Sequence, residues 1–280
     1  MRLSVFTVSV PDLTPAQLIA AAKEAGLDGI EWRYTKVPDS VKHEAPSFWG
    51  NNRCTLDPNS DEAYFTALGE EVRSSGMATT ALAPYLSAGD AEGTERAMIH
   101  AKAMGASMIR VGVHRYDRSR SYNELFESQL QYLQEVQRLS RLYGVKGVIE
   151  THHVTIAPSA SLAHRLVESF DPDHVGVLYD PGNMVHEGYE NFRLGMELLG
   201  PYLAHVHVKN AGWFRNSEGR WECRWQPFAE GWVDWKQVLR DLKAVHYEGG
   251  YGVEDFSGTL ESRAMLAQFA DWFRTLNDEV

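Results

Sequence analysis

Four residues that could bind a metal ion lie at the ends of short apolar runs. Glu150 closes GVIE, Asp180 closes VGVLYD, His207 lies in AHVHV and Glu254 closes GYGVE. Short continuous apolar runs are typical of parallel strands that are buried on both faces. Three carboxylates and one imidazole at the same ends of neighbouring parallel strands would form one divalent metal site. A charged residue can also cap a buried strand without any function, but four in consecutive strands favour a site.

The ligand types limit which metal this site would prefer. Oxygen ligands with one imidazole suit Mn²⁺, Mg²⁺, Co²⁺ or Zn²⁺, and we expect one divalent ion, with Mn²⁺ as the first choice. Neither Cys54 nor Cys223 is placed to join the set, so a structural zinc is not expected. A metal with open coordination positions would polarise a substrate carbonyl and hold an adjacent hydroxyl.

The rest of the chain alternates strand and helix patterns that could position these residues. Strands are predicted over residues 2–10, 29–32, 77–83, 107–113, 145–150, 175–179, 203–208 and 250–254. Helices are predicted over residues 14–25, 60–75, 94–104, 121–143, 158–170, 191–199, 235–245 and 260–276. Eight strand–helix units predict an α/β fold, a single (β/α)₈ TIM barrel spanning residues 1–280, with catalytic residues at the carboxyl ends of its strands. The alternative is an open doubly wound sheet, although the chain lacks the glycine-rich phosphate loops that would support it.

Composition excludes several classes of partner. The 280 residues carry a formal net charge of −11 and contain no run rich in Lys or Arg, which argues against a nucleic-acid partner. No apolar run approaches the length of a membrane span, and the N-terminus becomes polar too soon for a signal peptide. The two cysteines lie far apart in sequence and suggest no disulfide framework. These features predict a reduced, cytoplasmic protein with no membrane partner.

Several segments, taken in order, resemble a known family. They are GLDGIEWR, VIETHH, YDPGN, HVHVKN, FAEGWVDW and GGYGVEDFS. Together they resemble the xylose-isomerase-like barrel superfamily, and within it the sugar phosphate isomerase/epimerase group, over essentially the whole chain. The most specific local signal is the HxHxK[DN] pattern formed by His205, His207, Lys209 and Asn210.

The resemblance implies a mechanism and a set of roles. The Glu–Asp–His–Glu ligand set of the family corresponds to Glu150, Asp180, His207 and Glu254. In relatives, one metal-bound glutamate removes a proton next to a carbonyl, the metal stabilises an enediolate, and the other glutamate returns the proton. Glu150 and Glu254 are therefore implied to be catalytic as well as metal ligands. The implied activity is that of an isomerase or epimerase of a sugar, keto-sugar or cyclitol, a small carbohydrate-like substrate, and relatives are often dimers or tetramers.

Two departures from the ketose 3-epimerase pattern leave an alternative open. Those enzymes carry a histidine where this chain has Asn183, and the run ETHHVTIAPS lacks their second glutamate. The ETH beginning instead resembles metal-dependent lyases and dehydratases, such as 3-dehydroshikimate dehydratases and 3-keto-glycoside lyases. Missing ligands and the negative charge argue against the three-zinc DNA-repair endonucleases of the superfamily. A barrel that only binds a carbohydrate would have no reason to assemble the metal set.

Other polar residues near strand ends are candidate substrate contacts. They are Glu31, His114, His152, His186, Lys209 and Arg215. Lys209 lies two residues after His207 and so shares its side of the strand. For the others, a solvated or supporting position is the alternative. The tryptophan-rich loop around Trp225 could form an aromatic wall over a sugar ring or simply pack as a lid.

Overall fold

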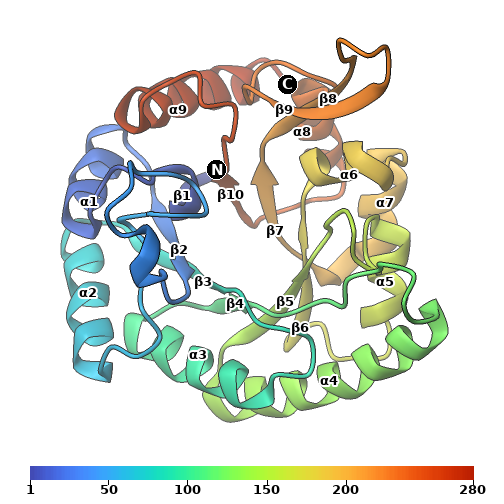
Figure 1. Ribbon diagram of the computed structural model, residues 1–280, viewed down its shortest axis with the longest axis horizontal. Coiled ribbons are helices and arrows are strands. Elements are labelled where there is room, and N and C mark those ends of the chain that lie inside the picture. The colour runs from blue at the N-terminus through green and yellow to red at the C-terminus, as the bar shows by residue number, and fades with distance from the viewer.

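The computed structural model describes residues 1–280 and shows a closed barrel of eight strands ringed by helices (Figure 1). The strands follow the order β1-β10-β7-β6-β5-β4-β3-β2, and every neighbouring pair is parallel. They are β1 Arg2–Phe6, β2 Gly29–Tyr34, β3 Ala78–Pro84, β4 Met108–Arg110, β5 Lys146–Glu150, β6 Val175–Tyr179, β7 Leu203–Val208 and β10 Gly250–Val253. The predicted TIM barrel is confirmed, and the open doubly wound sheet is wrong.

Nine α-helices connect or follow these strands. They are α1 Pro15–Glu24, α2 Glu62–Ser74, α3 Ala91–Met104, α4 Tyr122–Tyr143, α5 Ala160–Val167, α6 Pro181–Glu187, α7 Phe192–Leu199, α8 Trp235–Ala244 and α9 Ser262–Asp278. A capping box formed by Thr14 and Gln17 is present at the start of α1, where each side chain satisfies the other's backbone N–H. Helix α4 ends at Gly144, whose φ of 71° is the left-handed conformation that glycine adopts without strain.

The barrel departs from the predicted elements in four places. Strand β1 stops at Phe6, because the chain then forms the 3₁₀ turn Thr7–Ser9, and β4 is only three residues long. Helix α6 was not predicted, although Pro181 at its first position and Asp180 as its cap are helix-start signals. The segment predicted as a long loop after β7 contains an antiparallel hairpin, β8 Asn210–Arg215 and β9 Trp221–Gln226, which projects at the rim (Figure 1).

A single apolar core fixes the strands and so fixes the side chains at their ends. It contains 64 buried residues contributed by strands and by the inner faces of the helices. A smaller cluster of Phe6, Val8 and Ala83 packs with Phe48 and Phe256. Because protein cores are close-packed, side chains that emerge from this core have little freedom to drift. None of the nine helices combines the length and the apolar character that spanning a membrane requires.

Candidate metal centre and substrate pocket

The four residues singled out by their spacing converge at one point. Glu150 is the last residue of β5, Asp180 and Glu254 directly follow β6 and β10, and His207 is the fifth residue of β7. These strands are consecutive neighbours in the barrel. All four side chains are buried, and one potential ligand atom from each lies within 4.8 Å of the others. The cluster can therefore hold a metal ion.

The orientation of His207 is fixed by a carboxylate behind it. Its Nε2 lies 3.0 Å from Oε2 of the fully buried Glu31. An ionised carboxylate can only accept a hydrogen bond, so Nε2 carries a proton, and Nδ1 presents a lone pair when the imidazole is neutral. Burial lowers the pKa of His207, but the carboxylates of Glu31 and Glu254 outweigh it and raise this pKa well above its ordinary value, so a metal ion would have to displace the Nδ1 proton. This Nδ1 has no hydrogen-bond partner and lies 3.5 Å from Glu150, 3.6 Å from Asp180 and 3.5 Å from Glu254.

Those separations fit a shared cation better than direct hydrogen bonds. Hydrogen bonds between nitrogen and oxygen are usually about 2.7–3.2 Å long, whereas two atoms bound to one ion at about 2.0–2.2 Å each lie roughly 3–3.5 Å apart. Phe6 stacks on the His207 ring, with 5.5 Å between the ring centroids. The imidazole therefore has a supporting carboxylate, an aromatic backing and one unpartnered ligand atom.

Two cations partly neutralise the cluster. Lys209 Nζ is 2.9 Å from Asp180 and also pairs with Glu254, and Arg110 is 2.7 Å from Glu150. Counting Glu31, four buried carboxylates face these two cations, which leaves two formal negative charges when His207 is neutral. A bound divalent cation would balance them, and isolated buried charges are costly.

The pKa values of these carboxylates reflect the same competition. Burial raises the pKa of Asp180 above its ordinary value, and Lys209 only partly opposes this. Burial also acts on Glu150 and Glu254, but Arg110 and Lys209 respectively hold their pKa values below the ordinary value. The dominant causes are thus burial on one side and a specific cation on the other.

Asn183 is a supporting residue whose role was not predicted. Its amide nitrogen lies 3.0 Å from both Glu150 and Asp180 and 3.1 Å from the carbonyl oxygen of Thr151. Its backbone N–H also donates to the Asp180 carboxylate at 2.8 Å, because Asp180 caps α6. Asn183 therefore holds two predicted ligands in place from the first turn of the unpredicted helix.

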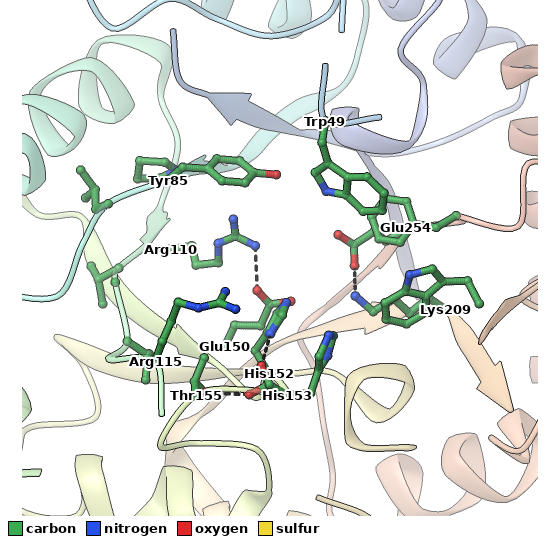
Figure 2. A pocket seen from close by; sticks show the side chains of 17 residues that line it. Trp49, Tyr85, Arg110, Arg115, Glu150, His152, His153, Thr155, Lys209 and Glu254 are labelled. Atoms are coloured by element: carbon green, nitrogen blue, oxygen red, sulfur yellow. Dashed lines mark hydrogen bonds and ion pairs between the residues drawn. The ribbon is translucent and has the colours of Figure 1, made fainter. Parts of the chain in front are cut away.

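A pocket of about 490 Å³ opens above the cluster (Figure 2). Glu150 and Glu254 line it, whereas Asp180 and His207 do not. Its other polar lining includes His152, His153, Thr155, Lys209, Arg110 and Arg115, and its aromatic lining is Trp49, Tyr85, Trp225 and Phe256. The two glutamates are thus the members of the metal cluster that can reach a substrate.

Two of the six candidate substrate contacts lie where they were expected. His152 and Lys209 line the pocket, and Figure 2 shows both beside the glutamates. The His152 Nδ1 lies 2.7 Å from the carbonyl oxygen of His153, which can only accept, so Nδ1 carries the proton and Nε2 is available as an acceptor.

The other four do not line the pocket, each for a local reason. Glu31 lies behind His207, so its position favours orienting that ligand. His186 stacks on His153, with 4.0 Å between ring centroids, and packs at a tilt against Trp225, at 4.7 Å. The remaining two are His114, whose Nε2 lies 3.0 Å from Ser128 Oγ, and Arg215, which projects along the hairpin over the ring of Trp221.

Arg110, Arg115 and Tyr85 lie in the pocket but were not predicted. Arg110 ends β4, which is the same sequence signal that identified the glutamates. The signal was hidden because the predicted strand continued to residue 113. Tyr85 directly follows β3, and the guanidinium groups of Arg33 and Arg110 each lie over its ring, at 5.1 and 5.2 Å from the ring centroid. These contacts belong to a cationic wall that the overall negative charge does not suggest.

A closed parallel barrel with a carboxylate–histidine cluster at the carboxyl ends of its strands defines a class of TIM barrels built around a candidate metal site. Residues 19–276 match the family described as xylose isomerase-like TIM barrel, and the chain belongs to that family. The sequence resemblance is therefore confirmed at the level of the family.

Individual relatives are more distant. Inosose dehydratase of Mesomycoplasma hyopneumoniae (strain 7448) is 25% identical over 120 residues, which cover 39% of this chain and only 40% of that protein. The solved structure of the IOLI protein with a bound zinc atom is 18% identical, with a TM-score of 0.73 and coverage of 100% of this chain and 99% of that one. D-allulose 3-epimerase from Methylomonas sp. is 15% identical, with a TM-score of 0.71 and coverage of 99% and 98%. The two structures show that the fold is shared.

Proposed function

We propose that the protein is a divalent-metal-dependent isomerase or epimerase of a sugar, keto-sugar or cyclitol. The observation that carries this proposal is that only two of the four candidate metal ligands line the pocket. Asp180 and His207 are shielded from the pocket, whereas Glu150 and Glu254 face both the cluster and the pocket. A site that only stored a metal would not need carboxylates open to a ligand. The zinc bound by the IOLI protein and the epimerase activity named for the Methylomonas protein support the same assignment.

The two glutamates are placed to move a proton. They reach the pocket from β5 and β10, which β6 and β7 separate in the barrel, so they meet a bound substrate from two sides. When bound, a divalent cation would polarise the substrate carbonyl and offset the charge that develops as the neighbouring proton leaves. One glutamate would accept that proton and the other would return one. The result is either an inverted configuration at that carbon or a carbonyl group moved to the neighbouring carbon. Lys209 and His152 are placed to hold hydroxyl groups by hydrogen bonds.

A lyase or dehydratase on the same scaffold is the second candidate. The specific observation is the position of Lys209, which lines the pocket and pairs directly with Glu254. An ammonium group beside a base can donate the proton with which a departing hydroxyl group leaves as water, which epimerisation does not require. The similarity to inosose dehydratase supports this reading.

Exchange with solvent deuterium tests the proposed chemistry before the substrate is known. Protein freed of metal, then supplied with Mn²⁺, Mg²⁺, Co²⁺ or Zn²⁺, is incubated in heavy water with ketoses, keto-cyclitols and 3-keto-glycosides. We expect metal-dependent uptake of deuterium by one compound, with Mn²⁺ the most effective ion. A product of unchanged composition identifies an isomerase or epimerase, and loss of water identifies a dehydratase.

Variants then test the two glutamates. Glu150→Gln and Glu254→Gln should each slow product formation by roughly 10²–10⁴-fold, the usual contribution of a positioned acid or base, because conversion requires both glutamates. Glu222→Gln, on the exposed hairpin, is the matched control and should leave product formation unchanged. Folding is verified by circular dichroism. Near-normal product formation in either active-site variant, or exchange that persists without metal, would show that the two-glutamate mechanism is wrong.

A further inference from the structure

We propose that Arg115 binds an anionic substituent, a carboxylate or phosphate group, on the substrate of this pocket. The proposal rests on the proposed function for the identity of the reacting site, but its test does not require turnover. It narrows the substrate class from neutral carbohydrates to sugar acids, carboxylated cyclitols or sugar phosphates.

Arg115 differs from the other pocket cations in having no ionic partner. Arg110 pairs with Glu150 at 2.7 Å, and Lys209 pairs with Asp180 at 2.9 Å. Arg115 lines the same pocket but forms no ion pair with any carboxylate within 4.0 Å. Its guanidinium group therefore keeps all of its charge and its donor fork for a ligand.

The backbone around Arg115 is held by a second loop. An antiparallel bridge joins Arg115 to Thr155. On either side of that bridge, the Tyr116 N–H donates to the carbonyl oxygen of Val154 at 2.9 Å, and the Ile156 N–H donates to that of His114 at 3.0 Å. The loops after β4 and β5 thus form a short ribbon at the rim, which fixes where the arginine begins.

The side chain points inward from that ribbon. Figure 2 shows Arg115 directed into the pocket toward Glu150 and His152, on the wall opposite Trp49 and Glu254. A substrate whose reacting carbon meets the glutamates would place a substituent against this wall.

Chemistry decides which substituent suits this wall. Arginine binds carboxylate and phosphate oxygens through two parallel hydrogen bonds, and such charge-assisted bonds are about twice as strong as neutral ones. A neutral hydroxyl would accept from one donor and would lack the opposite charge and the second parallel hydrogen bond. Because the chain is acidic overall, with a net charge of −11, an anionic ligand needs a local unpaired cation to bind here.

Three non-reacting probes test the inference on metal-free protein, prepared by chelation and exhaustive dialysis. They are sorbitol, gluconate and sorbitol 6-phosphate, which share a polyol chain and differ in charge. None has an aldehyde or ketone group, so their binding is independent of enolisation, and the absence of metal removes chelation by gluconate. Dissociation constants are measured by calorimetry for the wild type, for Arg115→Gln and for the control Arg120→Gln. Arg120 is an exposed arginine of the same loop that does not line the pocket.

We expect gluconate or sorbitol 6-phosphate to bind the wild type at least tenfold more tightly than sorbitol. Arg115→Gln should remove most of that advantage and leave sorbitol binding unchanged, and Arg120→Gln should change neither. The advantage should also shrink with added salt, because an exposed charge is screened. Whichever anion shows the Arg115-dependent gain identifies the substituent.

Three results would overturn the inference: no binding by either anion, equal binding by all three probes, or an equal loss in both arginine variants. The deuterium exchange experiment is unaffected by any of them. Exchange on a neutral ketose together with no Arg115-dependent anion binding would retain the proposed function and reject the anionic substrate. Arg115-dependent anion binding without metal-dependent exchange on any substrate would retain the anion subsite and reject the proposed chemistry.

Discussion

The role of Glu31 gives the sharpest test of the metal centre. Glu31 touches no part of the pocket, and its Oε2 lies 3.0 Å from His207 Nε2 and 3.4 Å from His205 Nε2. If it sets the tautomer of His207, then changing Glu31→Gln should weaken metal binding without removing any metal ligand. Supporting carboxylates of this kind orient metal-bound histidines and increase their basicity.

The expected magnitude follows from the hydrogen bond that changes. A bond to a charged group contributes about 1.5–3 kcal/mol and a neutral one about 0.5–1.5 kcal/mol, and Glu31 is fully buried, so solvent does not screen the difference. If the new amide presents its oxygen, about 1–1.5 kcal/mol is lost, which is roughly a tenfold weaker affinity. If it presents its NH₂ group, the imidazole proton moves to Nδ1 and the lone pair is lost, which sets the upper end near 100-fold.

The assay is a calorimetric titration of metal-free protein with Mn²⁺ at fixed pH. Glu44→Gln removes the same charge from an exposed loop and is the control for changes in net charge. We expect wild-type affinity for Glu44→Gln and a 10- to 100-fold weaker one for Glu31→Gln. Equal affinities in the two variants would refute the argument that a buried carboxylate fixes His207 as a ligand.

Two further predictions concern stability. Lys209→Met should lower the free energy of unfolding of metal-free protein by about 3–5 kcal/mol, because it leaves buried Asp180 and Glu254 without their cation. Urea unfolding measures this loss, which should be smaller when Mn²⁺ is present. An equal loss with and without Mn²⁺ would count against a shared cation site. Burial, with help from the neighbouring His152, His186 and Lys209, lowers the pKa of His153 to about 3 from 6.5. Below pH 6.5 the unfolded chain therefore binds a proton that the folded protein does not, so stability falls as the pH drops from 6.5 toward 3. The free energy of unfolding, measured with urea across this pH range, should fall less steeply in His153→Gln, by the slope that uptake of up to one proton produces. The exposed-site control His43→Gln should keep the wild-type slope. Parallel curves for all three proteins would contradict the lowered pKa.

The candidate metal ligands could be predicted because they follow from strand period and barrel geometry alone. Each ends or closely precedes the end of a buried apolar run, and parallel strands bring such ends to one rim. The same reasoning failed for Arg110, since apolar residues continue to Val113 after β4 has ended and the prediction placed the strand end there. Where a strand leaves the sheet depends on pairing with its neighbours, which a run of apolar letters does not record.

The contacts made by the loops also could not be predicted from the sequence. Arg115 and Tyr85 belong to segments that have no periodic pattern, and their directions are set by backbone pairing and packing across the rim. The hairpin β8–β9 escaped prediction because its residues are partly exposed and mix aromatic with charged side chains. It matters to the site, since it carries Trp225, which packs at 5.6 Å from Phe256 over the pocket.

Strand β7 shows most directly how this sequence produces the site. Side chains two residues apart point to the same face of a strand. His205, His207 and Lys209 therefore form one column, in which His205 faces Glu31, His207 faces the predicted metal ligands and Lys209 reaches the pocket. The alternate residues Val206 and Val208 are buried in the apolar core. A shift of one residue would turn those valines toward the carboxylates and bury the column in the core, so the spacing of two is required by the fold and by the chemistry together.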